Sequence, residues 1–367
     1  MNISKIPIKE LSIQIDSSLL DPNCIGIDFG TERTKLAYPS ACIDSESTTK
    51  YTANFATFET NEKTGVEVLI KYLTDKLPDL KSDSSSGRKN WKVQVTGARA
   101  TQAAADSIKQ QLGLEISFVD EASSQCRGAS FLMTRCDSAD TAYPAPFIDP
   151  AEFAGLEHGE TFKKFNEAQV DLMSGDSKFP CLLGVFGSIC RVFLMQEDGR
   201  GEEVHTQNLS GKSFLGICQL FTGVSDYSVL MSMAAAGKRG NIDSQIRDLL
   251  ADMKNSPYGR LPPSLAVFPF GKAVDNDRSF EDTRPQDLVH SLVATFTSNL
   301  IYTITQMAMF YGARSIRFAG GFFNHECPRA ELIKTAKLFT AIDSMDVEFF
   351  KIDQIAALGA ILRDIST

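Results

Sequence analysis

One pattern occurs twice in this chain, near the start of each half, and it restricts the possible folds more than any other feature. I-G-I-D-F-G-T-E-R-T-K-L-A-Y at 25–38 and L-L-G-V-F-G-S-I-C-R-V-F-L at 182–194 each combine an apolar strand, a Phe-Gly-Thr or Phe-Gly-Ser turn and a second apolar strand. The copies begin at 25 and 182, 157 residues apart in a chain of 367. We therefore expect a duplicated architecture with one glycine turn in each half.

The predicted elements along the chain are those of an α/β protein, because strand-like runs alternate with helical runs throughout. At about 150 residues per domain, the length suggests two domains, which we place at 24–180 and 181–367. Residues 1–23 have no sustained apolar segment and are expected to be a disordered or docking lead-in. Residues 39–64 are polar and poorly periodic, so we expect a loop or a ragged strand.

The uncharged segment at 288–313 is long enough to span a bilayer. Polar residues interrupt it throughout, however, and its apolar residues Leu292, Phe296, Leu300 and Ile304 recur at helical spacing. We therefore predict a long buried helix in a soluble core, and no membrane span.

The charge balance restricts the partners. Asp and Glu outnumber Lys and Arg by 46 to 37, and the net charge of −9 argues against nucleic acid or an anionic membrane. An anionic small molecule is compatible with this balance, because glycine-loop amides, helix N-termini or a metal ion supply local positive charge. The eight cysteines include no C-x-x-C pair, so we expect buried reduced thiols in a cytoplasmic protein, without a zinc site or disulfides.

The first glycine turn has the groups that a phosphate-binding hairpin needs. Gly30 permits a tight turn that exposes backbone N–H groups, and Thr31 adds a hydroxyl. Asp28 is a candidate ligand for a magnesium ion, usually through water, and Lys35 would offset phosphate charge. The alternative for this motif alone is an ordinary β-hairpin turn.

A second and a third glycine turn favour the phosphate interpretation. Gly187 and Ser188 form the second turn, and two such turns facing one another across a cleft would grip both sides of a triphosphate. Gly320 and Gly321, within S-I-R-F-A-G-G-F-F-N, offer a third contact at the adenosine end.

The Gly211-Lys212-Ser213 sequence does not fit a P-loop, because the first glycine of that motif would fall on Thr206. Its structural alternative is a strand-to-helix turn whose serine caps the following helix.

Taken in order, these segments resemble the eukaryotic-type (type II) pantothenate kinases, within the actin, hexokinase and sugar-kinase superfamily. V-T-G-A-R-A at 95–100 is similar to that family's V-T-G-G-G-A, and F-V-D-E-A-S-S-Q-C-R-G-A at 118–129 resembles the segment with its catalytic glutamate. F-P-C-L-L-G-V-F-G-S at 179–188 and L-S-G-K-S-F-L-G-I-C-Q-L-F-T-G at 209–223 are similar to its second turn and its L-G-G-G-T-F-L-G-L-C-x-L-L-T-G segment. F-A-G-G-F-F-N and A-A-L-G-A-I-L complete a likeness that runs from about 24 to 363.

The resemblance implies a duplicated actin-like (ribonuclease H-like) ATPase fold, with a nucleotide cleft between two domains and dimerisation helices in the second. It implies ATP-dependent phosphorylation of pantothenate, the first step of coenzyme A synthesis, in which Glu121 accepts the proton of the attacking hydroxyl. On its own chemistry, Glu121 is equally compatible with a capping charge at a helix start. The residues implied in binding ATP and Mg²⁺ are Asp28, Gly30, Thr31, Lys35, Gly187, Ser188, Gly211, Ser213, Gly320 and Gly321.

The positions implied in substrate binding are Ser188, Arg191 and Glu203, and two of them depart from the family. Arg191 replaces a small serine, and Glu203 replaces the arginine that binds the substrate, which reverses the charge toward an anionic pantothenate. A shift of a few residues would place Arg200 there instead. In addition, Ile189 stands where the second turn of the family has glycine, which would crowd a close approach to phosphate.

Three functions therefore stay open. The intact first hairpin and Glu121 favour an active pantothenate kinase. The departures, including Lys212 within the family's triple glycine, favour a catalytically impaired regulatory subunit that associates with an active paralogue. A kinase for a different hydroxyl substrate would combine a preserved catalytic core with a changed pocket, in which Arg191 is a new anion contact. The resemblance further implies a dimer, with an identical chain or a paralogue, and acetyl-CoA as a feedback inhibitor.

Overall fold

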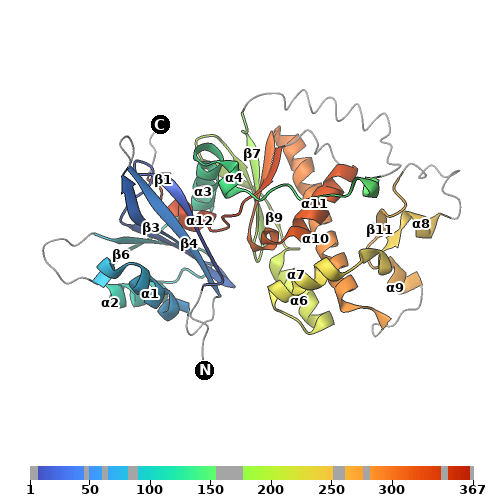
Figure 1. Ribbon diagram of the computed structural model, residues 1–367, viewed down its shortest axis with the longest axis horizontal. Helices are drawn as coiled ribbons and strands as arrows, with labels where there is room; N and C mark the ends of the chain where they lie inside the picture. Colours follow the sequence, from blue (N-terminus) through green and yellow to red (C-terminus); the bar gives the residue numbers. More distant parts are fainter. Residues whose placement is uncertain are drawn as a thin grey trace. The chain divides into compact units, whose positions relative to one another are not determined.

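The computed structural model describes residues 7–44, 49–59, 65–81, 90–153, 177–250, 261–275, 282–339 and 346–363. The chain forms two compact units, each assembled from separate stretches (Figure 1). Unit 1 consists of Met1–Ala142, Met195–Glu202 and Lys351–Thr367, and unit 2 of Tyr143–Leu194 and Glu203–Phe350. The predicted domains, 24–180 and 181–367, were each a single continuous stretch. In the structure, two later stretches, Met195–Glu202 and Lys351–Thr367, group with unit 1.

Unit 1 is built on a six-stranded sheet in the order β1-β4-β3-β2-β5-β6. Strands β1 to β4 pair antiparallel with their neighbours, and β5 and β6 continue the sheet in parallel from β2. The strands are β1 Lys9–Asp16, β2 Cys24–Phe29, β3 Arg33–Asp44, β4 Thr49–Glu59, β5 Lys92–Thr96 and β6 Glu115–Phe118. The helices are α1 Gly65–Lys76, η1 Pro78–Lys81, α2 Gln102–Leu112, α3 Glu121–Arg135, α4 Ser138–Thr141 and α12 Ile355–Ile361.

Side chains alternate between the two faces of this sheet. Ile25 and Ile27 of β2 point into a core shared with α1 and α2. Gly26 lies on the opposite face beneath α12, where a Cβ atom would come within 2.1 Å of a helix carbonyl oxygen. The small residues of α12 also permit close contact with α3, since a Cβ at Gly359 would lie 1.9 Å from the carbonyl oxygen of Ser124.

Unit 2 contains a five-stranded sheet in the order β13-β12-β7-β8-β9, in which β12 is parallel to β7 and β13. Its main strands are β7 Cys181–Phe186, β8 Cys190–Met195, β9 Gly201–Gln207, β12 Ser315–Ala319 and β13 Asp346–Phe349; β10 Ser244–Gln245 and β11 Ala266–Phe268 form a small second sheet. The helices are η2 Pro150–Phe153, α6 Gly211–Thr222, α7 Tyr227–Ala236, η3 Arg239–Asn241, α8 Ile246–Leu249, α9 Gly271–Asp275, α10 Pro285–Tyr311, η5 Gly321–Asn324 and α11 Glu326–Phe339.

The two large sheets share one strand order. The series β4-β3-β2-β5-β6 of unit 1 corresponds to β9-β8-β7-β12-β13 of unit 2. The two predicted glycine turns join equivalent strands, β2 to β3 and β7 to β8. The prediction of an α/β fold with a duplicated architecture is thereby confirmed, and β1 is an addition to the unit 1 sheet.

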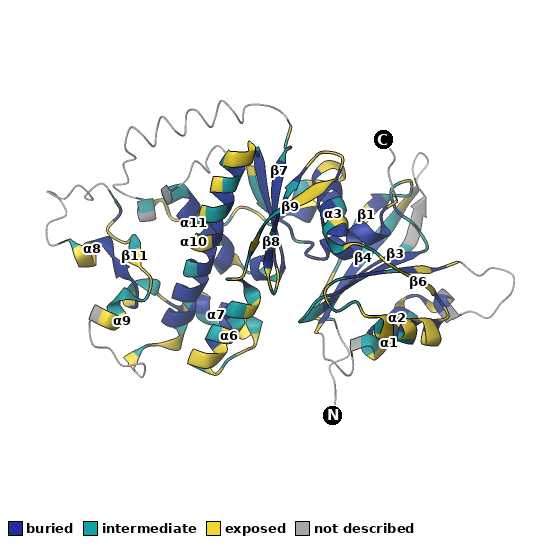
Figure 2. Cartoon of the chain, turned by 180° about the vertical axis from the view of Figure 1, so that it is seen from behind, coloured by how far each residue is buried: buried dark blue, intermediate teal, exposed yellow. Residues whose placement is uncertain are grey.

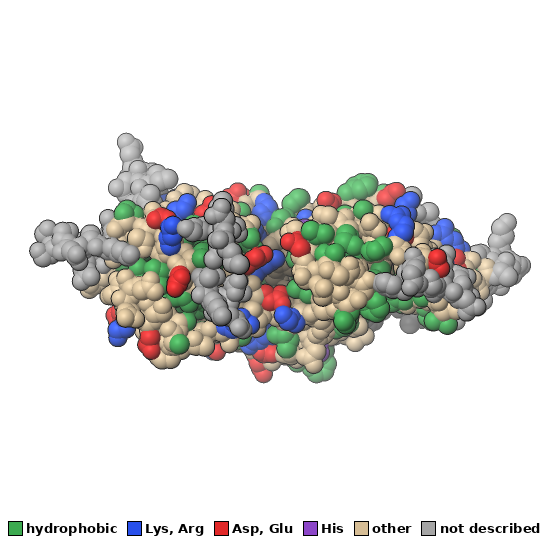
Figure 3. Space-filling view, turned by 90° about the horizontal axis from the view of Figure 1, so that it is seen from below, with side chains coloured by type: hydrophobic (Ala, Val, Ile, Leu, Met, Phe, Trp, Pro, Cys, Tyr) green, Lys and Arg blue, Asp and Glu red, His purple; other side chains and the backbone are tan. Residues whose placement is uncertain are grey.

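The prediction of a long buried helix at 288–313 is confirmed by α10, whose apolar residues Leu292, Phe296, Leu300 and Ile304 belong to the core of unit 2 (Figure 2). Among the described residues no single helix has the length and apolar composition of a membrane span, although the bent pair α6 and α7 meets both criteria together. Over the face in Figure 3, acidic and basic side chains are interspersed.

A disordered segment was the wrong expectation for part of the N-terminal region. Residues 9–16 form β1, which pairs with β4 along its whole length, instead of a disordered lead-in. The reason is an alternation that places Leu11, Ile13 and Ile15 on the inner side of the strand, although too few apolar residues are present for a strong sequence signal. For 39–64, the strand alternative is confirmed, since most of this segment extends β3 and forms β4.

Candidate functional site

A row of polar side chains crosses one face of the unit 1 sheet, near the end of β2. The strand register pairs Asp28 with Lys35, Lys35 with Thr57, and Thr57 with Lys9. On the other side of Asp28, its partner in β5 is Thr96. Residues directly opposite one another in a sheet point to the same face, so these five side chains form one continuous row.

The residues that precede α12 cover this row. Gln354 Nε2 donates a hydrogen bond to Thr57 Oγ1 at 2.9 Å. Lys35 Nζ donates to the carbonyl oxygen of Asp353 at 2.8 Å, and lies 3.8 Å from the carboxylate Oδ2 of the same residue. Although burial opposes ionisation, the charges of Lys35 and Lys9 hold the pKa of Asp353 below its ordinary value, so this carboxylate is charged at neutral pH.

Several buried oxygens in this region have no hydrogen-bond partner among the described residues. They are Oδ1 of Asp28, Oγ1 of Thr96, Oδ2 of Asp353 and Oε1 of Gln354. Buried polar atoms in proteins are normally paired, so a group of such atoms at the end of one strand indicates a place for water, an ion or a ligand.

The carboxylate of Asp28 is suited to a cation. Burial raises its pKa to about 6, the charges of Glu121 and Asp353 add to the rise, and Lys35 opposes it. A cation at Oδ1 would offset both the lost hydration and the repulsion between carboxylates. The described residues contain no group of three or more His, Cys, Asp or Glu side chains able to hold a metal ion, so Asp28 fits Mg²⁺ only as one ligand beside phosphate and water oxygens.

Two glycines shape the backbone around Asp28. Gly30 N donates a hydrogen bond to the carbonyl oxygen of Arg33 at 3.1 Å and closes the predicted turn, which also contains Thr31. Gly97, in the V-T-G-A-R-A segment, has a φ of +99°, and a Cβ there would lie 2.4 Å from Asp28 Oδ1. Glycine is therefore required at 97 both by its backbone conformation and by its contact with the site.

Glu121 is the first residue of α3, but it is not the helix cap. The N-cap is Asp120, whose carboxylate accepts a hydrogen bond from Ser123 N at 2.7 Å. Glu121 accepts a hydrogen bond from Gln125 Nε2 at 2.9 Å, and its charge contributes to the raised pKa of Asp28. Asp120 is thus the N-cap, while the Glu121 charge lies in the first turn of α3 and within electrostatic range of Asp28.

In unit 2, three of the predicted glycine positions meet at the end of β7. A Cβ at Gly211 would lie 2.6 Å from the carbonyl oxygen of Gly187, to which Gly211 N donates a hydrogen bond at 3.0 Å. Gly320 has a φ of +115°, and a Cβ there would lie 2.1 Å from the carbonyl oxygen of Phe186. Gly321 follows as the first residue of η5. The structure therefore brings together the second turn, the start of α6 and the end of β12.

The serine expected to cap α6 does not do so. Ser210, rather than Ser213, occupies the N-cap position, and its hydroxyl donates to the carbonyl oxygen of Ser188 at 2.6 Å instead of capping the helix. Ser213 Oγ donates to the carbonyl oxygen of Asn208 at 2.8 Å. Lys212 N also donates to Ser188, at 3.3 Å, so the start of α6 holds the second turn in place.

The two substrate positions that depart from the resemblance are paired with one another. Arg191 donates from Nε and Nη2 to Glu203 Oε2, at 2.8 and 2.5 Å, and the hydroxyl of Thr206 donates to the other carboxylate oxygen. These hydrogen bonds, that from Arg191 first, lower the pKa of Glu203. The charge reversal at 203 is therefore neutralised within unit 2. Arg200, the suggested substitute, pairs with Asp198 at the hairpin tip.

Ile189 does not fill the second turn. Its side chain is 43% exposed, and its carbonyl oxygen accepts the hydrogen bond from Gly187 N at 3.1 Å that closes the turn. Any crowding of a phosphate by Ile189 would therefore come from an exposed side chain at the edge of the turn, and not from a side chain inside it.

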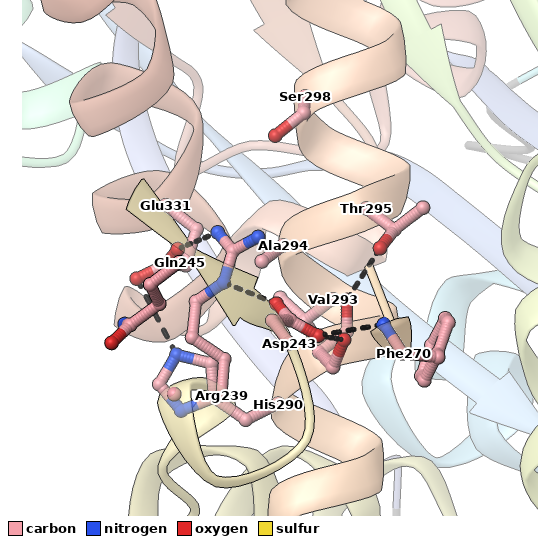
Figure 4. Close-up of polar contacts among 12 residues, drawn as sticks. Arg239, Asp243, Gln245, Phe270, His290, Val293, Ala294, Thr295, Ser298 and Glu331 are labelled. Carbon is pink, nitrogen blue, oxygen red and sulfur yellow. Dashed lines mark hydrogen bonds and ion pairs between the residues drawn. The ribbon is translucent and has the colours of Figure 1, made fainter. Parts of the chain in front are cut away.

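A cavity of about 640 Å³ in unit 2 is lined by residues that sequence reasoning did not identify as functional. Arg239 joins Asp243 at 2.7 Å and Glu331 at 3.2 Å beside it (Figure 4). Although burial opposes ionisation, His290 and nearby cations hold the pKa of Glu331 well below its ordinary value. Phe270 N and the hydroxyl of Ser291 donate to Asp243. Protein groups thus satisfy the carboxylates of Asp243 and Glu331, and this network ties α10 and α11 to the segment between α7 and β10.

Comparison with known proteins gave four matches: one family model, two plant proteins and one solved structure. The Fumble family model matches residues 24–363. Pantothenate kinase 2 of Arabidopsis thaliana is 26% identical over 271 residues, 74% of this chain but 28% of that protein, and Pantothenate kinase 1 of the same plant is 27% identical over 314 residues, 83% of this chain and 76% of that protein. A solved ROK family protein from Streptococcus pneumoniae TIGR4 covers 92% of this chain and 96% of its own at 13% identity, with a TM-score of 0.43. The chain thus spans little more than a quarter of the first plant relative.

Proposed function

Because the chain belongs to the Fumble family, we propose that it is an ATP-dependent pantothenate kinase. The observation that carries the proposal is the polar row at the end of β2, where Asp28 and Lys35 lie side by side and buried oxygens lack partners. Two relatives in Arabidopsis thaliana are pantothenate kinases by name, and their likeness covers 74% and 83% of this chain.

The residues of unit 1 have distinct roles in this reaction. The hydroxyl oxygen of pantothenate forms a bond to the γ-phosphorus of ATP, the bond from that phosphorus to the bridging oxygen of ADP breaks, and Glu121 accepts the hydroxyl proton. Lys35 offsets phosphate charge, and the Gly30 turn with Thr31 offers donors to the phosphate oxygens. Asp28 would hold Mg²⁺, which supplies further charge neutralisation when bound.

The predicted nucleotide contacts of unit 2, at Gly187, Ser188, Gly211, Ser213, Gly320 and Gly321, are part of the same proposal. Their support is the convergence of these segments at the end of β7. Dimerisation and inhibition by acetyl-CoA are further predictions from the resemblance, and a cytoplasmic location is a further prediction from the cysteine usage.

One observation favours a second candidate, a kinase for another hydroxyl compound. The hydrogen-bonded pair of Arg191 and Glu203 has no net charge, whereas a carboxylate substrate requires a cation that is not already neutralised. An acceptor without a carboxylate is compatible with such a pair.

The test is phosphorylation of pantothenate by the purified full chain with Mg-ATP, beside a Glu121→Gln variant. We expect turnover in the wild type and a kcat about 10² to 10⁴-fold lower in the variant, because a single proton acceptor contributes about that much. Pantetheine, which has the same hydroxyl end but no carboxylate, is the matched acceptor. Turnover of pantetheine alone would favour the second candidate, and turnover of neither acceptor by folded protein that binds Mg-ATP would favour the regulatory subunit.

A further inference from the structure

The first strand contributes a cation to the polar row from outside the family match, which begins at residue 24. In β1 the residues alternate between an inner and an outer side, and Lys9 is on the inner side with Leu11, Ile13 and Ile15. Its Nζ lies 2.9 Å from Asp353 Oδ1 and donates to the carbonyl oxygen of Lys351 at 2.6 Å. The carboxylate that it contacts is 1% exposed.

The buried carboxylate of Asp353 therefore forms ion pairs with two lysines, at two different distances. Lys9 is within hydrogen-bond distance of Oδ1, whereas Lys35 Nζ is 3.8 Å from Oδ2, which is too long for a hydrogen bond. Lys35 is instead held by the backbone carbonyl of Asp353, at 2.8 Å. The short contact thus pairs Asp353 Oδ1 with Lys9, while Lys35, which lies opposite Asp28, makes no side-chain hydrogen bond to Asp353.

We propose that Lys9 is a positioning residue for phosphate binding, which neutralises Asp353 so that Lys35 keeps a positive charge for the phosphate chain of a nucleotide. The inference rests on the phosphate-binding role given to Lys35 in the proposed function. The charges of Lys9, Lys35 and Asp353 sum to +1 with Lys9 in place and to zero without it. Asp28, which lies opposite Lys35, and Arg33, whose charge also acts on Asp353, are unchanged in this comparison. Asp353 fixes the position of Lys35, and Lys9 prevents that same carboxylate from cancelling its charge.

The structural alternative is that Lys9 protects the edge of the sheet, since lysines on edge strands discourage pairing with another chain. Such a lysine, whether it points outward or inward, needs no buried carboxylate as its partner. Lys9 instead lies on the inner side of β1, at a position where the alternation predicts an apolar residue, and it contacts a buried carboxylate. Burial of a lone carboxylate is costly, so the contact demands a charge-based explanation.

Charge arithmetic gives a test that separates the two explanations. Binding of tripolyphosphate to the full chain is measured by calorimetry at low ionic strength, with the wild type, Lys9→Met, Asp353→Asn and the double variant. The three-residue charges are +1, 0, +2 and +1. We expect affinity about tenfold weaker than wild type for Lys9→Met, equal or tighter for Asp353→Asn, and near wild type for the double variant.

Matched variants control for disturbance of the strand. Glu10→Gln changes an outward side chain of the same strand and should leave the affinity unchanged, Lys9→Arg should retain binding, and Lys35→Met should abolish it. If Asp353→Asn does not fold, Lys9→Met and the double variant still decide the question.

The inference is overturned if Lys9→Met binds like the wild type, if the double variant is as weak as Lys9→Met, or if the wild type binds no tripolyphosphate. Phosphorylation of pantothenate is measured separately. If the wild type does not phosphorylate pantothenate but the four proteins bind tripolyphosphate with the expected affinities, the proposed function is overturned and the role of Lys9 is retained.

Discussion

The two glycine turns occupy equivalent places in two sheets of the same strand order, yet their surroundings differ in charge. In each turn the glycine N–H donates across the turn, Gly30 to Arg33 and Gly187 to Ile189, both at 3.1 Å. Two residues beyond these acceptors lie Lys35 and Arg191, which are therefore equivalent positions on β3 and β8. Opposite Lys35 is Asp28, whereas 157 residues after Asp28 the second copy has Val185.

The equivalent cations are also paired differently. Lys35 shares the Asp353 carboxylate with Lys9 and lies 3.8 Å from it, whereas Arg191 makes two hydrogen bonds to Glu203. Among the described residues, the first turn thus lies beside buried oxygens without hydrogen-bond partners and a lysine whose nearest carboxylate also pairs with Lys9, while the cation beside the second turn makes two hydrogen bonds to one carboxylate. The two sheets have the same strand order, and the segments placed over each turn determine the charges beside it.

The largest expected effect tests whether the backbones around the two turns are equivalent. Gly97 follows β5 and Gly320 follows β12; both have positive φ, and a Cβ at either would clash with the residues just before a turn. Gly97→Ala and Gly320→Ala should each lower the free energy of unfolding by about 4 kcal/mol, from strain plus overpacking. Urea unfolding measures this.

The matched control for the two glycines is Gly223→Ala, at a φ of +70° with no atom within 4 Å of the added Cβ. Strain alone should cost about 1 kcal/mol there. Equal losses in all three variants would show that contact with the turns contributes nothing, and a large loss at only one of Gly97 and Gly320 would break the equivalence of the two backbones.

The next effect concerns Asp28, which the second copy replaces by valine. Its pKa is raised to about 6, so folding favours the protonated form. Its stabilising contribution is present at low pH and is lost as the pH rises through 6, because the charged form must then be buried. Asp28→Asn should therefore raise the free energy of unfolding by about 2 kcal/mol at pH 7.5 and little at pH 4, while phosphorylation is lost.

Urea unfolding of wild type and Asp28→Asn at the two pH values is the measurement, with Asp106→Asn on the exposed surface of α2 as the control. A stabilisation that is equal at both pH values would contradict the assignment to the Asp28 charge. A lower free energy of unfolding for Asp28→Asn would show that the carboxylate stabilises the fold. The difference between Asp28 and Val185 would then concern stability and not phosphate binding.

Local sequence patterns predicted the parts of this site that are close in the chain. The strand, the Gly30 turn and the spacing of Asp28 and Lys35 follow from a single hairpin, so the sequence identified them together. Asp353 and Lys9 join the row from segments more than 300 residues apart, and their positions depend on strand register and on the return of the C-terminal segment to unit 1. The one available signal was a lysine at an inner position of the alternating K-E-L-S-I-Q-I segment.

Strand register also explains why the structure changes the interpretation of Arg191 and Glu203, the two departures near the second glycine turn. Sequence comparison identified Arg191 and Glu203 as separate departures and inferred a charge reversal from one of them. The structure pairs their side chains across β8 and β9, which no property of either segment alone predicts. Similarly, the identity of the α3 cap depended on a single residue, Asp120 in place of Glu121.

The smallest expected effect tests the neutrality of that pair. Replacing both members, Arg191→Met with Glu203→Met, keeps the net charge and removes a partly exposed ion pair, which should change the free energy of unfolding by at most about 1 kcal/mol. The KM for Mg-ATP should stay within about twofold of wild type, because the pair contributes no net charge. Glu203→Met alone removes the carboxylate to which Arg191 donates, so it should lower the KM of a carboxylate acceptor such as pantothenate relative to that of pantetheine. Steady-state kinetics with both acceptors measures the ratio of the KM for pantothenate to the KM for pantetheine. An unchanged ratio would place Arg191 and Glu203 outside the acceptor site. The two turns would then differ in function only through the charges of unit 1.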